Sequence, residues 1–229
     1  MGNSDVDLQP GTPRVFRDRR EAGRLLAPLL RGYAGRRDVI VLALPRGGVP
    51  VAYEVATALG VPLDVFTVRK LGVPGHEELA MGAIGSGGAF VLNREVIAGL
   101  NISHDEVVRV AERERRELER REHLYRDDLP YPQLEGKTVV LIDDGLATGA
   151  SMLVAVNALR QQRAAKIVVA VPVAPPDTCA LLREYADEAI CYETPEPFGG
   201  VGAWYEDFSQ VTDDEVRTLL HQASLRRAS

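Results

Sequence analysis

The sequence predicts an α/β protein in which a parallel sheet of five strands is flanked by helices. Short, wholly apolar runs alternate with segments whose apolar residues recur every three or four positions. This alternation is typical of strands buried on both faces and of the helices that cover them. We expect the strands at residues 39–44, 64–68, 139–142, 166–173 and 189–192.

The length and composition of the chain limit its organisation and its partners. The 229 residues suffice for one decorated α/β domain and are few for two. A net charge of −6 argues against nucleic acid as a partner, and no apolar run approaches the length that spans a membrane. The two cysteines, Cys179 and Cys191, are too few for a disulfide framework, so we expect small core residues in a cytoplasmic protein.

The two ends of the chain are expected to lie outside the core of the domain. Residues 1–13 are polar, contain Gly and Pro, and are predicted to be disordered. Residues 14–229 would then form a single domain with its core at about 36–192. A small hood would be built from residues 14–35 and 193–229.

The helices are predicted from apolar stripes and from capping residues. Ser103 with Glu106, and Thr212 with Glu215, have the spacing of capping boxes. The charged helix that begins after Ser103 carries many Glu–Arg pairs at i,i+4 spacing, which predicts a solvated helix lying across the core or against another subunit. The expected helices are 17–30, 49–59, 103–128, 152–160, 177–185 and 213–226.

The stretch at residues 139–152, VVLIDDGLATGASM, carries the chemistry that the other elements would serve. An apolar strand is followed by Asp143 and Asp144, by small residues, and by a helix N-terminus, which attracts phosphate through its free N–H groups and dipole. Hydroxyls of Thr148 and Ser151 can donate to the same anion. Carboxylates at a strand end can hold sugar hydroxyls or hydrated Mg2+. The alternative is a helix simply capped by Thr or Ser.

Two further groups of residues are candidates for anion binding. Pro45-Arg46-Gly47-Gly48 follows the first strand, and paired glycines let backbone N–H groups converge on an anion, although such a turn can also be merely tight. Arg69 and Lys70 follow the second strand, at the edge where open α/β sheets bind ligands. The alternative for Arg69 and Lys70 is a solvated pair.

Two glycine-rich segments are expected to be irregular. Residues 71–88 contain six glycines and would form a loop, before a short strand at 89–92 returns to the sheet edge. The segment after the last strand contains Phe198, Trp204 and Tyr205. These aromatic residues either stack against a flat heterocycle or pack the segment onto the core.

The motif around Asp143 and Asp144 resembles the phosphoribosyl pyrophosphate (PRPP) motif of type I phosphoribosyltransferases. With PRGGVPVA, RKLG and IDDGLATGASM in this order, the chain is similar to a group of bacterial phosphoribosyltransferases. The resemblance implies the Rossmann-like fold of that family. It also implies Mg2+-dependent transfer of the 5-phosphoribosyl group from PRPP to a nitrogenous base or amine, with release of pyrophosphate.

The resemblance also implies roles for individual residues. Asp143 and Asp144 would hold the ribose hydroxyls and Mg2+, and with Lys70 they are the candidate catalytic residues. Residues 71–88 would close over the reaction as a mobile loop. The 5′-phosphate would be bound by Ala147, Thr148, Gly149, Ala150 and Ser151. Pyrophosphate would be bound by Arg46, Gly47, Gly48, Arg69 and Lys70. The acceptor base would be bound by Phe198, Trp204 and Tyr205.

Two departures from the family pattern affect what can be expected. Hypoxanthine–guanine enzymes have Asp where this chain has Ala147, which argues against a 6-oxopurine acceptor. Relatives often have a bulkier residue at Gly145, so we expect a looser turn there. The alternative function is a non-catalytic PRPP or nucleotide sensor, but the added DNA-binding module or basic face of a regulator is not visible. We expect a homodimer.

Overall fold

The body of the protein is built on one parallel sheet, as predicted. The computed structural model describes residues 13–126 and 130–228, so the expected disordered segment 1–13 lies outside the described residues except for Pro13. Five strands lie in the order β2-β1-β6-β7-β8 and all pair in parallel. The strands are β1 (Val39–Ala43), β2 (Leu63–Val65), β6 (Thr138–Ile142), β7 (Lys166–Val173) and β8 (Glu188–Glu193).

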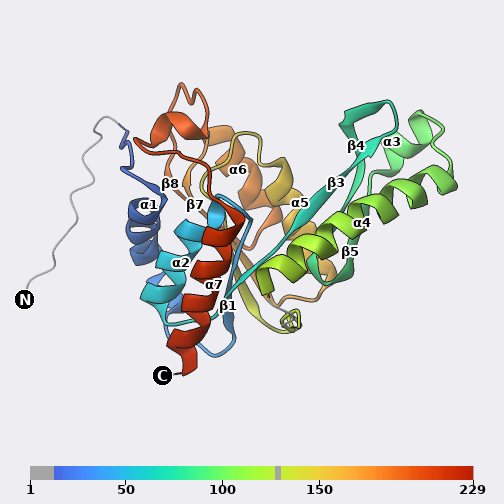
Figure 1. Ribbon diagram of the computed structural model, residues 1–229. Coiled ribbons are helices and arrows are strands. Elements are labelled where there is room, and N and C mark those ends of the chain that lie inside the picture. The colour runs from blue at the N-terminus through green and yellow to red at the C-terminus, as the bar shows by residue number, and fades with distance from the viewer. Residues whose placement is uncertain (1–12, 127–129, 229) are drawn as a thin grey trace, which may run out of the picture.

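Helices cover both faces of this sheet (Figure 1), which explains the uninterrupted apolar runs of its strands. Every residue of β1 and of β6 is buried. Val41 packs on the side of the first helical layer, and Leu42 packs on the side of the second. The first layer contains α1 (Arg19–Leu26), the 3-10 helix η1 (Ala27–Tyr33), α2 (Gly48–Leu59) and α7 (Asp213–Ala228). The second contains α5 (Ala150–Gln161) and α6 (Pro176–Tyr185).

Residues 68–126 form an arm that extends away from the body (Figure 1). A second, antiparallel sheet has the strand order β3-β4-β5, and the long helix α4 packs on β3 and β4. The apolar interior of the arm includes Leu71, Met81, Val110 and Leu118. Its elements are β3 (Val68–Val73), β4 (His76–Gly85), β5 (Ala89–Leu92), α3 (Arg94–Gly99) and α4 (His104–Arg126).

The prediction of an irregular loop at 71–88 is therefore wrong, because its glycines serve close strand pairing. A Cβ on Gly72 would lie 2.7 Å from the Glu77 carbonyl oxygen, and one on Gly82 would lie 2.5 Å from the Val91 carbonyl oxygen. The glycines thus allow the backbones to approach. The strand at 89–92 exists, but it pairs with β4 rather than with an edge of the main sheet.

The C-terminal end of α4 ties the arm to the body. Arg126 donates to the Asp64 carboxylate at 2.9 Å and to the Val65 carbonyl oxygen at 2.7 Å. The Tyr125 hydroxyl donates to Asp213 of α7 at 2.6 Å. Because β2 ends at Val65, these contacts hold the arm beside the carboxyl edge of the main sheet.

The expected helices are present with two differences. The Ser103–Glu106 capping box is confirmed, and at the last helix the Glu215 amide donates to the Thr212 hydroxyl, which confirms Thr212 as the N-cap. The helix expected over 17–30 changes from α to 3-10 at Ala27, where Pro28 removes a backbone donor. Helix α3 was not predicted. Residues 127–128 of the charged helix lie outside the described residues.

Cys179 and Cys191 form a disulfide, which corrects the expectation of unpaired core cysteines. Helix α6 packs against β8 and brings the two Cα atoms to 6.4 Å from each other. Cys179 is buried and Cys191 is half-buried. The pairing depends on this tertiary contact, which the spacing of two cysteines does not reveal.

The two ends of the chain meet in the region expected to form the hood. The Phe16 amide donates to the Trp204 carbonyl oxygen at 2.8 Å, and the Glu206 amide donates to the Phe16 carbonyl oxygen at 2.8 Å. The Phe16 ring is fully buried and lies 5.4 Å from the Tyr205 ring, centroid to centroid. The segment before α1 is thereby held against the segment before α7.

We expect Phe16→Ala to lower the free energy of unfolding by about 3–5 kcal/mol, because it leaves a cavity among aromatic rings. Chemical denaturation measures this change. The control is Val15→Ala in the same segment, where the side chain is 46% exposed and the change should stay within about 0.5 kcal/mol. Equal effects of the two substitutions would show that the hood contact contributes little.

Candidate active site

The two candidate loops lie side by side at the carboxyl edge of the main sheet. Strands β1 and β6 are neighbours, and Ala43 is in register with Ile142. The Leu44 amide continues the pairing by donating to the Ile142 carbonyl oxygen at 2.9 Å. The loop at 45–48 therefore begins next to Asp143 and Asp144, as expected for parallel strands.

Gly47 and Gly48 are required by the closeness of this approach. A Cβ on Gly47 would lie 2.1 Å from Oδ2 of Asp144, and one on Gly48 would lie 2.8 Å from the Ile142 carbonyl oxygen. The peptide between Pro45 and Arg46 is cis. The glycine pair thus allows the loop at 45–48 to approach the two carboxylates closely.

The loop at 145–151 leads into a helix whose N-cap residue has no side chain. Gly149 occupies the N-cap position with φ of 71°, in the left-handed region that glycine favours. Thr148, Ala150 and Ser151 are exposed, and the Ala150 amide has only a long contact of 3.4 Å with the Thr148 hydroxyl. The simple alternative of a helix capped by Thr or Ser at its N-cap is therefore not what the structure shows, and N–H groups of the first turn are left for a ligand.

The same loop is held firmly from behind. The Thr178 hydroxyl, at the start of α6, donates to the Ala147 carbonyl oxygen at 2.7 Å. A Cβ on Gly145 would lie 2.6 Å from Cγ1 of Val201 and 2.9 Å from Cγ1 of Val173. The expectation that Gly145 loosens the turn is wrong, because this glycine packs tightly between Val201 of the hood and Val173 of β7.

The two carboxylates have different surroundings. Asp143 accepts a hydrogen bond from the Asp144 amide at 2.9 Å, and burial together with the adjacent Asp144 raises the pKa of Asp143 well above its usual range. Asp144 instead forms an ion pair with Arg19, with 2.7 Å between Nε and Oδ2. Arg19 lies in an arginine-rich stretch, and nothing in the sequence distinguishes it from its neighbours.

Arg46 lies in the loop at 45–48 and is close to the C-terminal helix. Its guanidinium is 3.9 Å from Oδ1 of Asp213, the oxygen that accepts from Tyr125. Burial and the hydrogen bond to Asp213 raise the pKa of Tyr125 to about 12. Arg46 is thus the candidate phosphate-binding cation that the fold places directly at the two loops.

Arg69 and Lys70 lie within β3 of the arm, not at the end of a parallel strand as expected. Arg69 donates to Glu114 of α4 at 3.0 Å, and Lys70 donates to the Glu78 carbonyl oxygen at 2.9 Å. Strand β2 ends at Val65, before the pair is reached. The described contacts of both side chains therefore lie on the arm rather than at the loops of the body.

The predicted aromatic residues are mostly engaged in packing. Tyr205 is 6% exposed, and its hydroxyl donates to the Asp144 carbonyl oxygen. The Trp204 indole donates to the Phe198 carbonyl oxygen at 2.8 Å. Packing is thus the better interpretation for Tyr205. Phe198 and Trp204 are half-buried, and their contact with an acceptor stays a prediction.

The carboxylates suit a magnesium ion that brings most of its own ligands. Among the described residues, no group of three or more His, Cys, Asp or Glu side chains could hold a metal ion. Mg2+ is commonly bound by one or two carboxylates together with substrate phosphates and water. Asp143 and Asp144 fit that pattern only when a phosphorylated ligand completes it.

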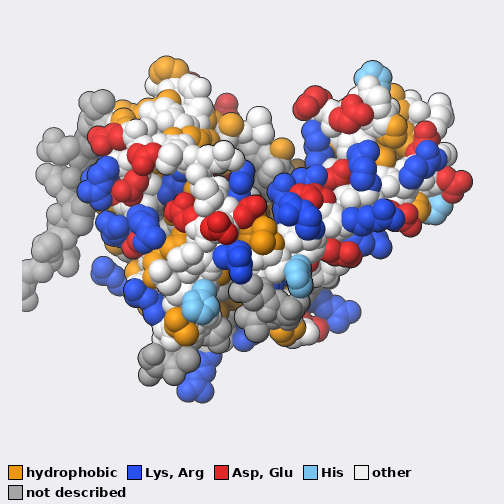
Figure 2. Space-filling model, viewed as in Figure 1, with side chains coloured by type: hydrophobic (Ala, Val, Ile, Leu, Met, Phe, Trp, Pro, Cys, Tyr) orange, Lys and Arg blue, Asp and Glu red, His pale blue; other side chains and the backbone are white. Residues whose placement is uncertain are grey.

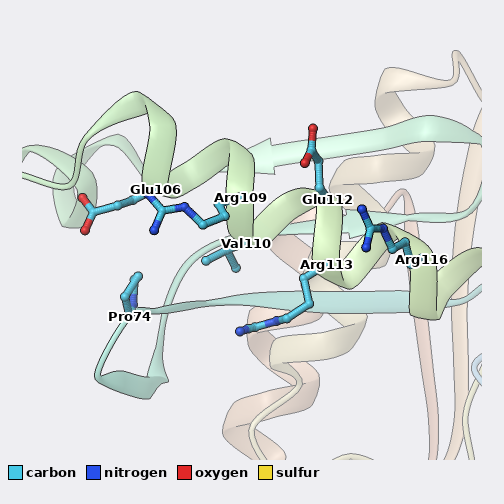
Figure 3. A pocket seen from close by; sticks show the side chains of 7 residues that line it. All are labelled: Pro74, Glu106, Arg109, Val110, Glu112, Arg113 and Arg116. Atoms are coloured by element: carbon cyan, nitrogen blue, oxygen red, sulfur yellow. The ribbon is translucent and has the colours of Figure 1, made fainter.

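The surface is notched between the arm and the body (Figure 2), and the arm has a hollow of its own (Figure 3). This hollow of about 420 Å³ lies between the β3–β4 turn and α4, and its lining mixes arginine and glutamate. It shares no residue with the loops at 45–48 and 143–151. Its lining residues are Pro74, Glu106, Arg109, Val110, Glu112, Arg113 and Arg116.

A family model described as the phosphoribosyl transferase domain matches residues 18–205. The chain belongs to this family. The matched range contains both loops of the candidate site, and it confirms the resemblance seen in the motif. No helix among the described residues is long and apolar enough to cross a membrane.

Individual relatives of this phosphoribosyl transferase domain agree with that assignment. Two curated proteins, from Mycobacterium tuberculosis strains CDC 1551 / Oshkosh and H37Rv, are 46% identical over 210 residues, which is 92% of this chain and 47% of theirs. Their names give phosphoribosyl transferase as a provisional assignment. The chain thus spans about half the length of these relatives. The crystal structure of TT1426 from Thermus thermophilus is 45% identical, with a TM-score of 0.80, and the match covers 91% of this chain and 98% of that one.

We expect opposite stability effects from the same substitution at the two acids. Asp143→Asn should raise the free energy of unfolding at pH 7, because the native state disfavours the ionised side chain. The gain should shrink as pH falls toward about 4, where the unfolded state also binds the proton. Asp144→Asn should lower the free energy of unfolding by about 3 kcal/mol, because Arg19 loses a largely buried partner. Denaturation curves from pH 4 to 8 measure both; destabilisation by Asp143→Asn at pH 7 would contradict this assignment.

Proposed function

We propose that the protein transfers the 5-phosphoribosyl group from PRPP to a nitrogenous base or amine, with Mg2+ bound and pyrophosphate released. The observation that carries this proposal is the glycine-capped N-terminus of α5 directly behind Asp143 and Asp144, beside the loop at 45–48. A sugar with a phosphate at one end and a pyrophosphate at the other matches this arrangement of charges and donors.

The 5′-phosphate would be bound by residues 147–151. Backbone N–H groups at the start of α5 and the exposed hydroxyls of Thr148 and Ser151 provide donors. The contact between Thr178 and the Ala147 carbonyl oxygen keeps the loop in place before the ligand arrives. Such preorganisation lowers the entropic cost of binding.

Asp143 and Asp144 would accept hydrogen bonds from the ribose hydroxyls. The same carboxylates favour positive charge that develops on the sugar as the bond to pyrophosphate breaks, which is where electrostatic catalysis is most effective. Mg2+, when bound, would neutralise pyrophosphate oxygens and thereby make pyrophosphate a better leaving group. Two carboxylates and a phosphorylated substrate are sufficient to hold it.

The leaving pyrophosphate would lie at Arg46, Gly47 and Gly48. Arg46 supplies positive charge, and the glycines let the backbone approach the oxygens. Arg69 and Lys70 would join only by exchanging their contacts with Glu114 and Glu78 for pyrophosphate oxygens. Lys70 is therefore the less well supported of the proposed catalytic residues.

Ala147 limits the range of acceptor bases that the site would bind. An Asp at this position faces the base in hypoxanthine–guanine enzymes, and alanine lacks the carboxylate needed for that contact. We therefore propose an acceptor other than a 6-oxopurine, held beside the hood near Phe198 and Trp204. We also propose that the protein acts as a homodimer in the cytoplasm.

The experiment combines purified protein, PRPP, Mg2+ and a panel of bases and amines, and it measures pyrophosphate release. We expect release with at least one acceptor. The double variant Asp143→Asn/Asp144→Asn should lose PRPP binding in calorimetry by about 100-fold or more, since both ribose ligands become neutral amides. The control Asp38→Asn changes a half-exposed carboxylate that precedes β1, at the opposite edge of the sheet, and should leave affinity unchanged.

Two outcomes would count against the proposal. PRPP binding without pyrophosphate release for any acceptor would indicate the non-catalytic sensor instead. Unchanged PRPP affinity in the double variant would show that the ribose does not bind at Asp143 and Asp144.

A further inference from the structure

Arg19 is a cation that reaches the candidate active site from the N-terminal end of the described chain. It is the first residue of α1, which starts there because the Asp18 carboxylate caps the helix by accepting from the Glu21 amide at 2.7 Å. Its Nε donates to Oδ2 of Asp144 at 2.7 Å. The two side chains are only 11% and 13% exposed, so water screens this ion pair weakly.

The orientation of Arg19 is set by the C-terminal part of the hood. Its Nη1 donates to the Ser209 carbonyl oxygen at 2.8 Å. Its guanidinium carbon lies 4.0 Å from the centroid of the Phe208 ring, a distance at which a cation and an aromatic face attract each other. The planar guanidinium thus donates from two positions to Asp144 and Ser209 while its face contacts Phe208. An ammonium group could not make these three contacts together.

The loop at 45–48 approaches the same oxygen of the Asp144 carboxylate that Arg19 binds. A Cβ on Gly47 would lie 2.1 Å from Oδ2, so the backbone of the loop and the guanidinium both contact this oxygen closely. Tyr205, also in the hood, donates to the Asp144 carbonyl oxygen. Two hood residues therefore hold Asp144: Tyr205 holds its backbone and Arg19 holds its side chain.

We propose that Arg19 is a positioning residue that fixes Asp144 for the ribose of PRPP and couples it to the C-terminal part of the hood. This inference rests on the proposed function, because it needs the ribose at Asp144. Arg19 acts through the carboxylate without touching the substrate. The hood then has a second role besides forming the acceptor side: its Phe208 and Ser209 determine where the guanidinium, and hence the Asp144 side chain, lies.

The test compares the dissociation constant of PRPP with Mg2+, measured by calorimetry, among variants. Arg19→Met keeps an aliphatic side chain but removes the charge, and we expect affinity to fall about 30-fold. Arg19→Lys should recover part of this loss. The matched control is Arg20→Met on the same helix, since Arg20 pairs with Glu54 and should leave affinity unchanged.

A double-mutant comparison separates positioning from general structural damage. If Arg19 acts through Asp144, then Arg19→Met combined with Asp144→Asn should bind PRPP no more weakly than Asp144→Asn alone. If Arg19→Met does not fold, Phe208→Ala provides the second route: it removes the stacking contact without removing charge. It should weaken PRPP binding measurably, although less than Asp144→Asn does, and unchanged affinity in Phe208→Ala would overturn the role of Arg19.

The outcomes distinguish this inference from the proposed function. Failure of the unmodified protein to bind PRPP would overturn the proposed function, and with it the premise of this inference. Normal PRPP binding by the unmodified protein together with unchanged affinity in Arg19→Met would overturn only the role of Arg19. Additive losses in the double variant, or an equal loss in Arg20→Met, would also overturn that role.

Discussion

The close contact between Asp144 and the backbone of Gly47 is the constraint on which the site depends. It exists because β1 and β6 are neighbouring parallel strands in register, so that the loops that follow them leave the sheet at one place. A side chain at Gly47 would collide with the carboxylate. The loop at 45–48 and the acidic motif are therefore two parts of one structure, and a side chain added at Gly47 would displace the Asp144 carboxylate.

The rest of the chain stabilises this junction from two directions. Helix α6 holds the loop at 147–151 through Thr178, and the hood holds Asp144 through Tyr205 and Arg19. The neighbouring, half-buried side chains of Asp143 and Asp144 destabilise the folded protein, as the raised pKa of Asp143 indicates. Functional sites typically contain such unfavourable charge interactions, because a bound ligand rather than the protein supplies the compensating charge.

The sequence predicted the body well because the apolar runs of its strands fit no other secondary structure. Apolar runs such as 139–142 are too short for buried helices and lie beside turn residues, so the five parallel strands and the acidic motif could be located. The arm was missed because the pattern of Gly72 and Gly82 looks the same whether glycines confer freedom or permit close strand pairing. The role of Arg19 depends on a contact between α1 and the distant loop after β6. The pairing of Cys179 with Cys191 depends on the packing of α6 against β8. No local pattern reports such contacts.

A crystal structure of the protein with PRPP and Mg2+ would show where each part of the ligand binds. We predict that 5′-phosphate oxygens lie within hydrogen-bonding distance of backbone N–H groups or hydroxyls of residues 147–151, with the ribose hydroxyls at Asp143 and Asp144. PRPP bound instead in the hollow of the arm, or with its ribose remote from both carboxylates, would contradict this prediction.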